Sequence, residues 1–265
     1  MMPLQNTLST FLNRIHEIKV HSYFVNTSIE LTRSIAPYID RGSLATNVPL
    51  MKDYELYHRS VAQIRSGDVR AALIVQAFSA LEWFVRALLL VSIEYIDSHT
   101  EKFCELPSNV ARMNIHLSGR ALAIQAEAKQ HNRVDVDQYC RGLGGCYADN
   151  ESFNLNSSAF GMFMKNLNSK VLAEVLKRVG YDINWDKIGA NKKLQKIVGE
   201  TSARKAGKAA KDLLNQLSKR RNEIAHQGDG SIDVSEHEID KYLAFLVAVS
   251  ISLTKGIEEC IKKNH

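Results

Sequence analysis

The sequence has little proline, glycine and cysteine, and these shortages narrow the fold class. Its 265 residues include 4 prolines, 14 glycines and 4 cysteines. Antiparallel β-sandwiches need many tight turns, which use glycine and proline, so the composition favours helix. Four cysteines are too few for a disulfide scaffold. The apolar fraction of 45% and the charged fraction of 24% are ordinary for a globular protein and exclude disorder as the dominant state.

Long uncharged apolar runs and an export signal are also missing. The longest uncharged apolar stretch, Tyr242–Thr254, has 13 residues, whereas a membrane span needs about 20. The apolar run Ala71–Ile93 is interrupted by Glu82 and Arg86, which lie four residues apart and can pair on one helical face. The N-terminus does not resemble a secretory signal. The cysteines have no metal-binding spacing, so we expect free thiols, a cytoplasmic protein, and neither metal nor cofactor.

Hydrophobic residues recur at helical spacing along the first part of the chain. The pattern predicts helices over about 4–25 and 27–35, the second stopped by Pro37. A loop followed by a helix is expected over 45–66. The strongest apolar helix is predicted over about 69–96, with Asp68 as its N-cap. Because this helix is apolar nearly all round, it is expected at the centre of a bundle.

The second part of the chain is also predicted to be helical. A helix is expected to start at Asn168 or Ser169 and to end at Gly180, another to lead up to Gly228, and a last one to follow a capping box at Ser235. The glycine-rich segment 141–145 lacks the spacing of a phosphate-binding loop and is interpreted as a turn.

No run alternates strictly between apolar and polar residues as a strand pair does. We therefore predict an all-α fold in a single helical domain over 1–265. It consists of an N-terminal helical extension over 1–66 and a core over 67–265, with an irregular insertion over about 105–165.

Positive charge is concentrated in one segment. Lys187–Arg221 carries eleven Lys and Arg residues against two acidic residues, a net charge of +9, so the rest of the chain sums to −4 of the total +5. Such a segment suits a phosphate-rich partner, although a solvated helix face that keeps the protein soluble explains the same charge. The candidate RNA-contacting residues are Lys192, Lys193, Lys196, Arg204, Lys205 and Lys208.

Arg221, Asn222 and His226 form a constellation with chemical potential near the end of one predicted helix. Asn222 and His226 are four residues apart and share a helical face. Histidine serves as a general acid or base near neutral pH, and the arginine fork matches phosphate geometry. Such a set suffices to break a phosphodiester without metal when the substrate is RNA, whose 2′-OH is an internal nucleophile. The alternative is a pair of cations that only stabilises the helix end.

The run Arg221-Asn222-Glu223-Ile224-Ala225-His226 resembles the signature of the HEPN superfamily, an Arg followed by a polar residue and, after four to six residues in all, a His. An amphipathic helix precedes the run, and a long apolar helix follows it. The segment 80–86 resembles the early core helix of the family, which often carries an acidic residue, here Glu82. The resemblance covers about 68–262 and is nearest to the bacterial RiboL-PSP-associated group.

The resemblance implies a four- or five-helix bundle that forms a homodimer, with the two motifs facing each other in a composite cleft. It also implies a metal-independent endoribonuclease that leaves a 2′,3′-cyclic phosphate and acts as a toxin or an antiviral-defence effector. His226 is then expected in proton transfer, Arg221 on the phosphate, and Asn222 as the residue that orients either. Glu223, Arg220, Glu82 and His237 are weaker candidates for a supporting role.

Two other functions remain open. One is a catalytically idle HEPN module that binds RNA or a partner protein, because fold alone does not determine function. The other is an adaptor bundle whose basic segment binds a different polyanion. If the chain is an active nuclease, we expect a restraining partner such as an antitoxin or a nucleotidyltransferase that modifies it.

Overall fold

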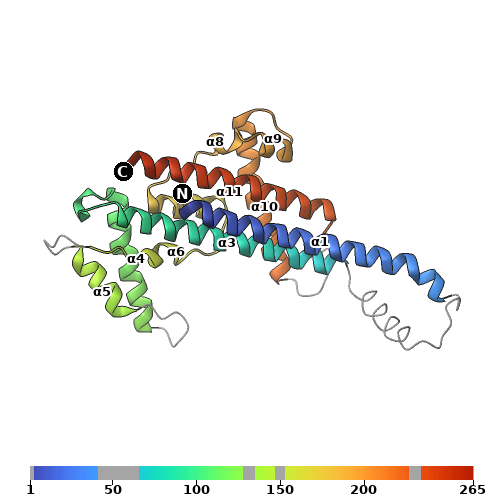
Figure 1. The fold of residues 1–265 in the computed structure, drawn as a ribbon, viewed down its shortest axis with the longest axis horizontal. Helices are drawn as coiled ribbons and strands as arrows, with labels where there is room; N and C mark the ends of the chain where they lie inside the picture. The colour runs from blue at the N-terminus through green and yellow to red at the C-terminus, as the bar shows by residue number, and fades with distance from the viewer. Residues whose placement is uncertain (1–2, 41–65, 128–134, 147–152, 227–233, 265) are drawn as a thin grey trace.

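The computed structural model describes residues 3–40, 66–127, 135–146, 153–226 and 234–264, and these residues form helices and short connections without a β-strand (Figure 1). The prediction of an all-α fold is confirmed. The helices are α1 (Pro3–Asp40), α3 (Ser66–Ser98), α4 (Ser108–Glu127), α5 (Val136–Gly145), α6 (Ser157–Gly161), α7 (Ser169–Leu176), α8 (Trp185–Gly189), α9 (Lys192–Val198), α10 (Ala203–His226) and α11 (Glu236–Asn264), with 3-10 turns η1 (Phe103–Glu105) and η2 (Lys177–Val179).

Three long helices, α1, α3 and α11, form the spine of the bundle, and α10 packs across α3 (Figure 1). The rings of Phe11 on α1 and Phe84 on α3 lie 4.6 Å apart, and both side chains are fully buried. Gln5 near the start of α1 donates a hydrogen bond of 2.7 Å to Glu258 near the end of α11. This bond joins the start of α1 to the end of α11, so the two helices run antiparallel.

The apolar helix predicted over about 69–96 is α3, and it lies at the centre of the bundle, as predicted. It packs against α1, α6, α10 and α11, and Phe78, Leu81, Phe84 and Leu88 are buried in the core. Among the described residues α3 is also the one helix that is long and apolar enough for a membrane span, but half of that stretch is buried inside the bundle. Such burial is what a core helix requires.

The prediction of two N-terminal helices was wrong, because α1 continues without a break to Asp40. The side chain of Asn26 does not cap a helix and instead accepts hydrogen bonds from Nε and Nη2 of Arg70, at 3.3 and 3.0 Å. Pro37 does not stop the helix either. The helix continues for three residues beyond it, to Asp40. The segment 45–66 lies almost entirely outside the described residues.

Two predictions of local structure around α3 and α5 were also wrong. The helix α3 begins at Ser66, so Asp68 lies in its first turn, where a negative charge is favourable, rather than at its N-cap. The glycine-rich segment 141–145 is the last part of α5. A Cβ at Gly142 would lie 2.8 Å from Oδ1 of Asn156, so this glycine allows a close approach to the chain before α6 and does not form a turn.

The middle of the chain, expected to be irregular, carries α4, α5 and α6. A buried polar network connects them. Asn114 on α4 accepts a hydrogen bond of 3.0 Å from the backbone N–H of Asn156, and the Asn156 amide donates to Ser118 and to the carbonyl of Tyr139. Two of the buried residues of α4, Asn114 and Ser118, are polar, so they interrupt the apolar repeat by which a helix is recognised from the sequence.

The segment after the middle region leads into α10. Asn168 caps α7, and Gly180 ends the following turn with a φ of +83°, so both predicted boundaries are confirmed. The helix α8 packs closely against the start of α10 because residues 189 and 207 are glycines. A Cβ at either position would overlap backbone atoms of the other helix. The last helix begins after Ser235, whose hydroxyl accepts a hydrogen bond of 3.1 Å from the N–H of Glu238. This is half of the predicted capping box, since the Glu238 carboxylate bonds to Arg220.

Candidate active site

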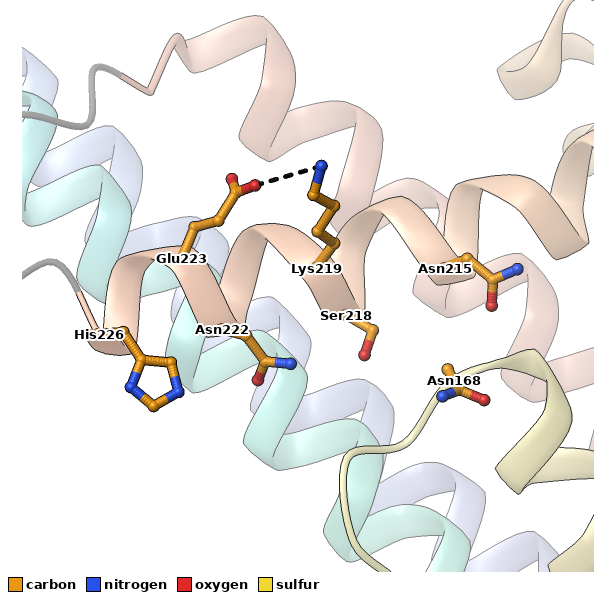
Figure 2. A pocket seen from close by; sticks show the side chains of 7 residues that line it. All are labelled: Asn168, Asn215, Ser218, Lys219, Asn222, Glu223 and His226. Carbon is orange, nitrogen blue, oxygen red and sulfur yellow. Dashed lines mark ion pairs between the residues drawn. The ribbon is translucent and has the colours of Figure 1, made fainter.

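The last three turns of α10 present a polar stripe on one face. Asn215, Ser218, Asn222 and His226 succeed one another at intervals of three or four residues, the spacing that aligns side chains along a helix. The stripe forms one wall of an open pocket of about 540 Å³ (Figure 2). The pocket is lined by Asn168, Asn215, Ser218, Lys219, Asn222, Glu223 and His226.

Asn222 and His226 thus line the same pocket, and His226 is exposed at the end of α10. Figure 2 shows both side chains on the same side of the helix. An imidazole and an amide in one open pocket are able to meet the same substrate group. This is the arrangement that their four-residue spacing predicts.

Arg221 does not line the pocket and approaches it through Asn222. Its Nη1 donates a hydrogen bond of 3.0 Å to Oδ1 of Asn222, and its Cζ lies 5.5 Å from the centre of the Phe78 ring on α3. Its Nε is buried and has no hydrogen-bond partner in the described part of the chain. The guanidinium therefore holds the Asn222 amide in one orientation and places a permanent positive charge behind it.

Ion pairs surround the other flank of the motif. Glu223 lies between Lys219 and Arg220, at 3.7 and 3.8 Å, and Arg220 reaches Glu238 on α11 at 3.2 Å. Burial raises the pKa of the nearby Tyr242, and the Glu238 carboxylate adds to the rise by repelling a phenolate and by accepting a hydrogen bond from the neutral hydroxyl. Arg220 thus bridges two carboxylates and ties α10 to α11.

Asn168 closes the pocket from the other side. Its Oδ1 accepts hydrogen bonds from the N–H groups of Lys170 and Val171, at 2.9 and 3.0 Å, as the N-cap of α7. Asn215 reaches the same helix start, since its Oδ1 accepts a 3.0 Å bond from the N–H of Ser169. These bonds join α7 to α10 and give the pocket its second wall (Figure 2).

Two of the predicted supporting residues lie elsewhere. Glu82 is half-buried on α3, and His237 is exposed in the first turn of α11; neither lines the pocket. The expected pair of Glu82 with Arg86 is absent from the ion pairs of the described residues, and Arg86 donates to the carbonyl of Met164 at 3.4 Å.

The predicted RNA-contacting residues are exposed on α9 and on the first turns of α10: Lys192, Lys193, Lys196, Arg204, Lys205 and Lys208. Lys208 precedes His226 by 18 residues on the same helix, a separation of about 27 Å at 1.5 Å per residue. The basic surface and the pocket therefore do not contact the same nucleotide. A ligand that reaches both must be a polymer.

Asn168, Asn215 and Ser218 were not found from the sequence. The stripe on α10 carried a signal, because Asn215 and Ser218 lie seven and four residues before Asn222. Asn168 carried none, since it reaches the pocket only through the fold. In the described ranges, no group of three or more His, Cys, Asp or Glu side chains is placed to hold a metal ion.

Comparison with known proteins gives one match. The family model described as RiboL-PSP-HEPN matches residues 49–259, which include every helix from α3 to α10 and most of α11. No curated protein and no solved structure matches the chain.

Proposed function

The chain belongs to the RiboL-PSP-HEPN family, and on that premise we propose that it is a metal-independent endoribonuclease. The observation that carries the proposal is the pocket at the end of α10, which His226 and Asn222 line together while Arg221 holds the Asn222 amide. The family supports a nuclease-type or RNA-related role, and these three residues give that role a chemical means.

In the proposed reaction His226 removes the proton from the 2′-OH of the substrate. The 2′-oxygen attacks the adjacent phosphorus, and the bond from phosphorus to the 5′-oxygen breaks. The leaving 5′-oxygen takes up a proton from water, and the protonated His226 releases its proton to solvent afterwards. The products are a 2′,3′-cyclic phosphate and a 5′-hydroxyl. Negative charge grows on the phosphate oxygens during the attack. Donors that already point into the pocket stabilise that charge without reorganising.

Asn222 supplies one such donor. Because its Oδ1 accepts from Arg221 Nη1, its Nδ2 is turned away from the guanidinium and lies in the pocket (Figure 2). Arg221 polarises this amide, and its positive charge lies on the far side of Asn222 from the proposed phosphate position. Its role is thus partly that of a positioning residue for Asn222.

We further propose a homodimer in which the two pockets face each other, and a toxin or antiviral-defence role in the cytoplasm. A restraining partner, either an antitoxin or a nucleotidyltransferase, is expected because unrestrained RNA cleavage harms the host.

The test is incubation of the purified protein with total RNA in EDTA, followed by mapping of the product ends. Cleavage that leaves 2′,3′-cyclic phosphates in the parent and is lost in His226→Ala is expected. His116→Ala is the matched control, because His116 is exposed on α4 and lies outside the pocket. RNA that is bound by the parent and never cut would replace the nuclease with an idle RNA-binding module.

A further inference from the structure

The pocket holds three asparagines whose amides are each fixed in one orientation. The Oδ1 atoms of Asn168, Asn215 and Asn222 accept hydrogen bonds from backbone N–H groups or from a guanidinium. Backbone N–H and guanidinium groups only donate, so each partner must face oxygen and the flipped amide is excluded. In the described part of the chain, no Nδ2 of these three residues has a hydrogen-bond partner. All three are therefore available to donate.

The end of the pocket away from His226 therefore presents mainly donors. The three Nδ2 groups belong to side chains that line the pocket, and the Ser218 hydroxyl is able to donate or to accept. The Glu223 carboxylate is engaged by Lys219 and Arg220, at 3.7 and 3.8 Å. A ligand group that fits this wall must offer acceptors.

The length of the wall leaves room for more than a phosphate. Asn215 precedes Asn222 by seven residues, about 10 Å along the helix. With the reacting phosphate at Asn222 and His226, the end of the pocket at Asn215 and Asn168 receives the neighbouring nucleoside. The pocket volume of about 540 Å³ lies in the range of small-ligand sites, roughly 300–1,000 Å³.

The charge of this end favours a base over a second phosphate. Asn168, Asn215 and Ser218 are neutral, and the lysine of the pocket is paired with its glutamate. Neutral amides read base edges in nucleic acids, whereas phosphates are held mainly by Lys and Arg. Single-stranded RNA offers its base edges for such contacts.

We propose that Asn168 and Asn215 form a base subsite that selects keto bases, uracil or guanine, beside the cleaved phosphate. The carbonyl oxygens of these bases accept hydrogen bonds where cytosine and adenine carry amino groups that donate. The inference rests on the proposed function only in taking RNA as the ligand. Asn168 and Asn215 are specificity-determining residues in this account, and neither takes part in proton transfer.

One substitution at Asn168 replaces the hydrogen-bond donor by an acceptor and keeps the N-cap of α7. Asn168→Asp keeps the oxygen that caps α7, since Asp is as good an N-cap as Asn, and replaces the donating NH₂ by an accepting oxygen. Asn168→Ser also keeps a cap and removes the amide without adding charge. Asn184→Asp is the matched control, because Asn184 is an exposed N-cap, of α8, and lies outside the pocket.

The experiment measures, at one fixed salt concentration, the dissociation constants of 2′-O-methyl-uridine and 2′-O-methyl-cytidine hexamers. Neither hexamer has a free 2′-OH, so neither is cleaved by the proposed reaction. The two differ at the base edge that the amides read. The parent is expected to bind the uridine hexamer about tenfold more tightly. The preference should reverse in Asn168→Asp, weaken in Asn168→Ser, where the Asn215 donor remains, and persist in Asn184→Asp.

Equal affinities in the parent, a preference for cytidine, no binding of either hexamer, or an unchanged preference in Asn168→Asp would overturn the subsite. Cleavage of total RNA in EDTA is scored separately. Cleavage without a keto preference leaves the nuclease standing and removes the subsite. A keto preference without cleavage leaves the subsite standing and removes the nuclease.

Discussion

Asn222 connects the stability of the helix end with its proposed chemistry, and two substitutions separate these roles. Asn222→Ala removes both the acceptor for Arg221 and the donor in the pocket. Asn222→Asp keeps an acceptor at the 3.0 Å position next to Arg221 Nη1 and replaces the donor by a negatively charged oxygen. We expect both variants to lose about 100-fold in cleavage rate, the usual cost of one missing transition-state donor, but to differ in stability.

The stability difference follows from the surroundings of the guanidinium. In Asn222→Ala, Arg221 loses its acceptor while its Nε already lacks a partner in the described residues. Leaving a buried polar group unsatisfied costs about 1–3 kcal/mol, and the partial exposure of Arg221 favours the lower figure. For Asn222→Asp, the gain from an ion pair, at most about 1 kcal/mol, is offset by about 0.3–1 kcal/mol for a negative charge near a helix C-terminus.

Thermal unfolding therefore should place Asn222→Asp at the Tm of the parent and Asn222→Ala about 3 °C below it. Asn184→Asp controls for an added negative charge outside the pocket and should change neither the Tm nor cleavage. An Asn222→Ala protein as stable as the parent would show that the bond from Arg221 contributes nothing to the fold. Full cleavage by Asn222→Asp would show that the Nδ2 donor is not needed.

Three further outcomes are expected. Gly142→Ala should lower the free energy of unfolding by about 1–3 kcal/mol, because its Cβ would meet Asn156. Gly144→Ala, in open space on the same helix, should raise it by about 0.5–1 kcal/mol, and urea unfolding of both variants checks the pair. Burial raises the pKa of Asp97 above its usual value although the Leu155 N–H bonds to its carboxylate. The folded state therefore keeps this proton to higher pH than the unfolded state, and stability falls as pH rises from the unfolded pKa through the folded one. Asp97→Asn should accordingly be more stable than the parent at pH 7 and lose that advantage near pH 3, which denaturation at both pH values would show; an equal gain at both would contradict it. Chelators should leave the rate of RNA cleavage unchanged, and a loss that Mg²⁺ restores would contradict a metal-independent reaction.

The helices α3, α7, α10 and α11 were predictable because each carries a local signal. An apolar repeat at helical spacing, Asn168 before α7 and Gly180 after η2 are features that a few neighbouring residues decide. The placement of Asn222 and His226 in one pocket was predictable for the same reason, since the two residues lie four residues apart on a single helix. Local rules fail where a side chain serves a distant partner.

Asn26 and Gly142 illustrate that failure. Asn26 has the residue type of a cap, yet its oxygen accepts from Arg70, 44 residues away. Gly142 has the residue type of a turn, yet it lies within a helix because the chain near Asn156 passes too close for a Cβ. In each case a tertiary contact outweighs a local preference worth about 1 kcal/mol.

The pocket depends on such a contact as well. Asn168 lies 58 residues before His226 in the sequence, and its place opposite α10 depends on the bond of 3.0 Å from Ser169 N–H to Asn215. Asn215 thus uses its oxygen to hold α7 against α10 and leaves its nitrogen to the pocket. Since one amide serves both the packing and the proposed reading of a base, a substitution there must preserve the oxygen. Asn215→Asp does so and Asn215→Leu does not, and only the second should loosen the start of α7, which faster amide hydrogen exchange at Ser169 would reveal.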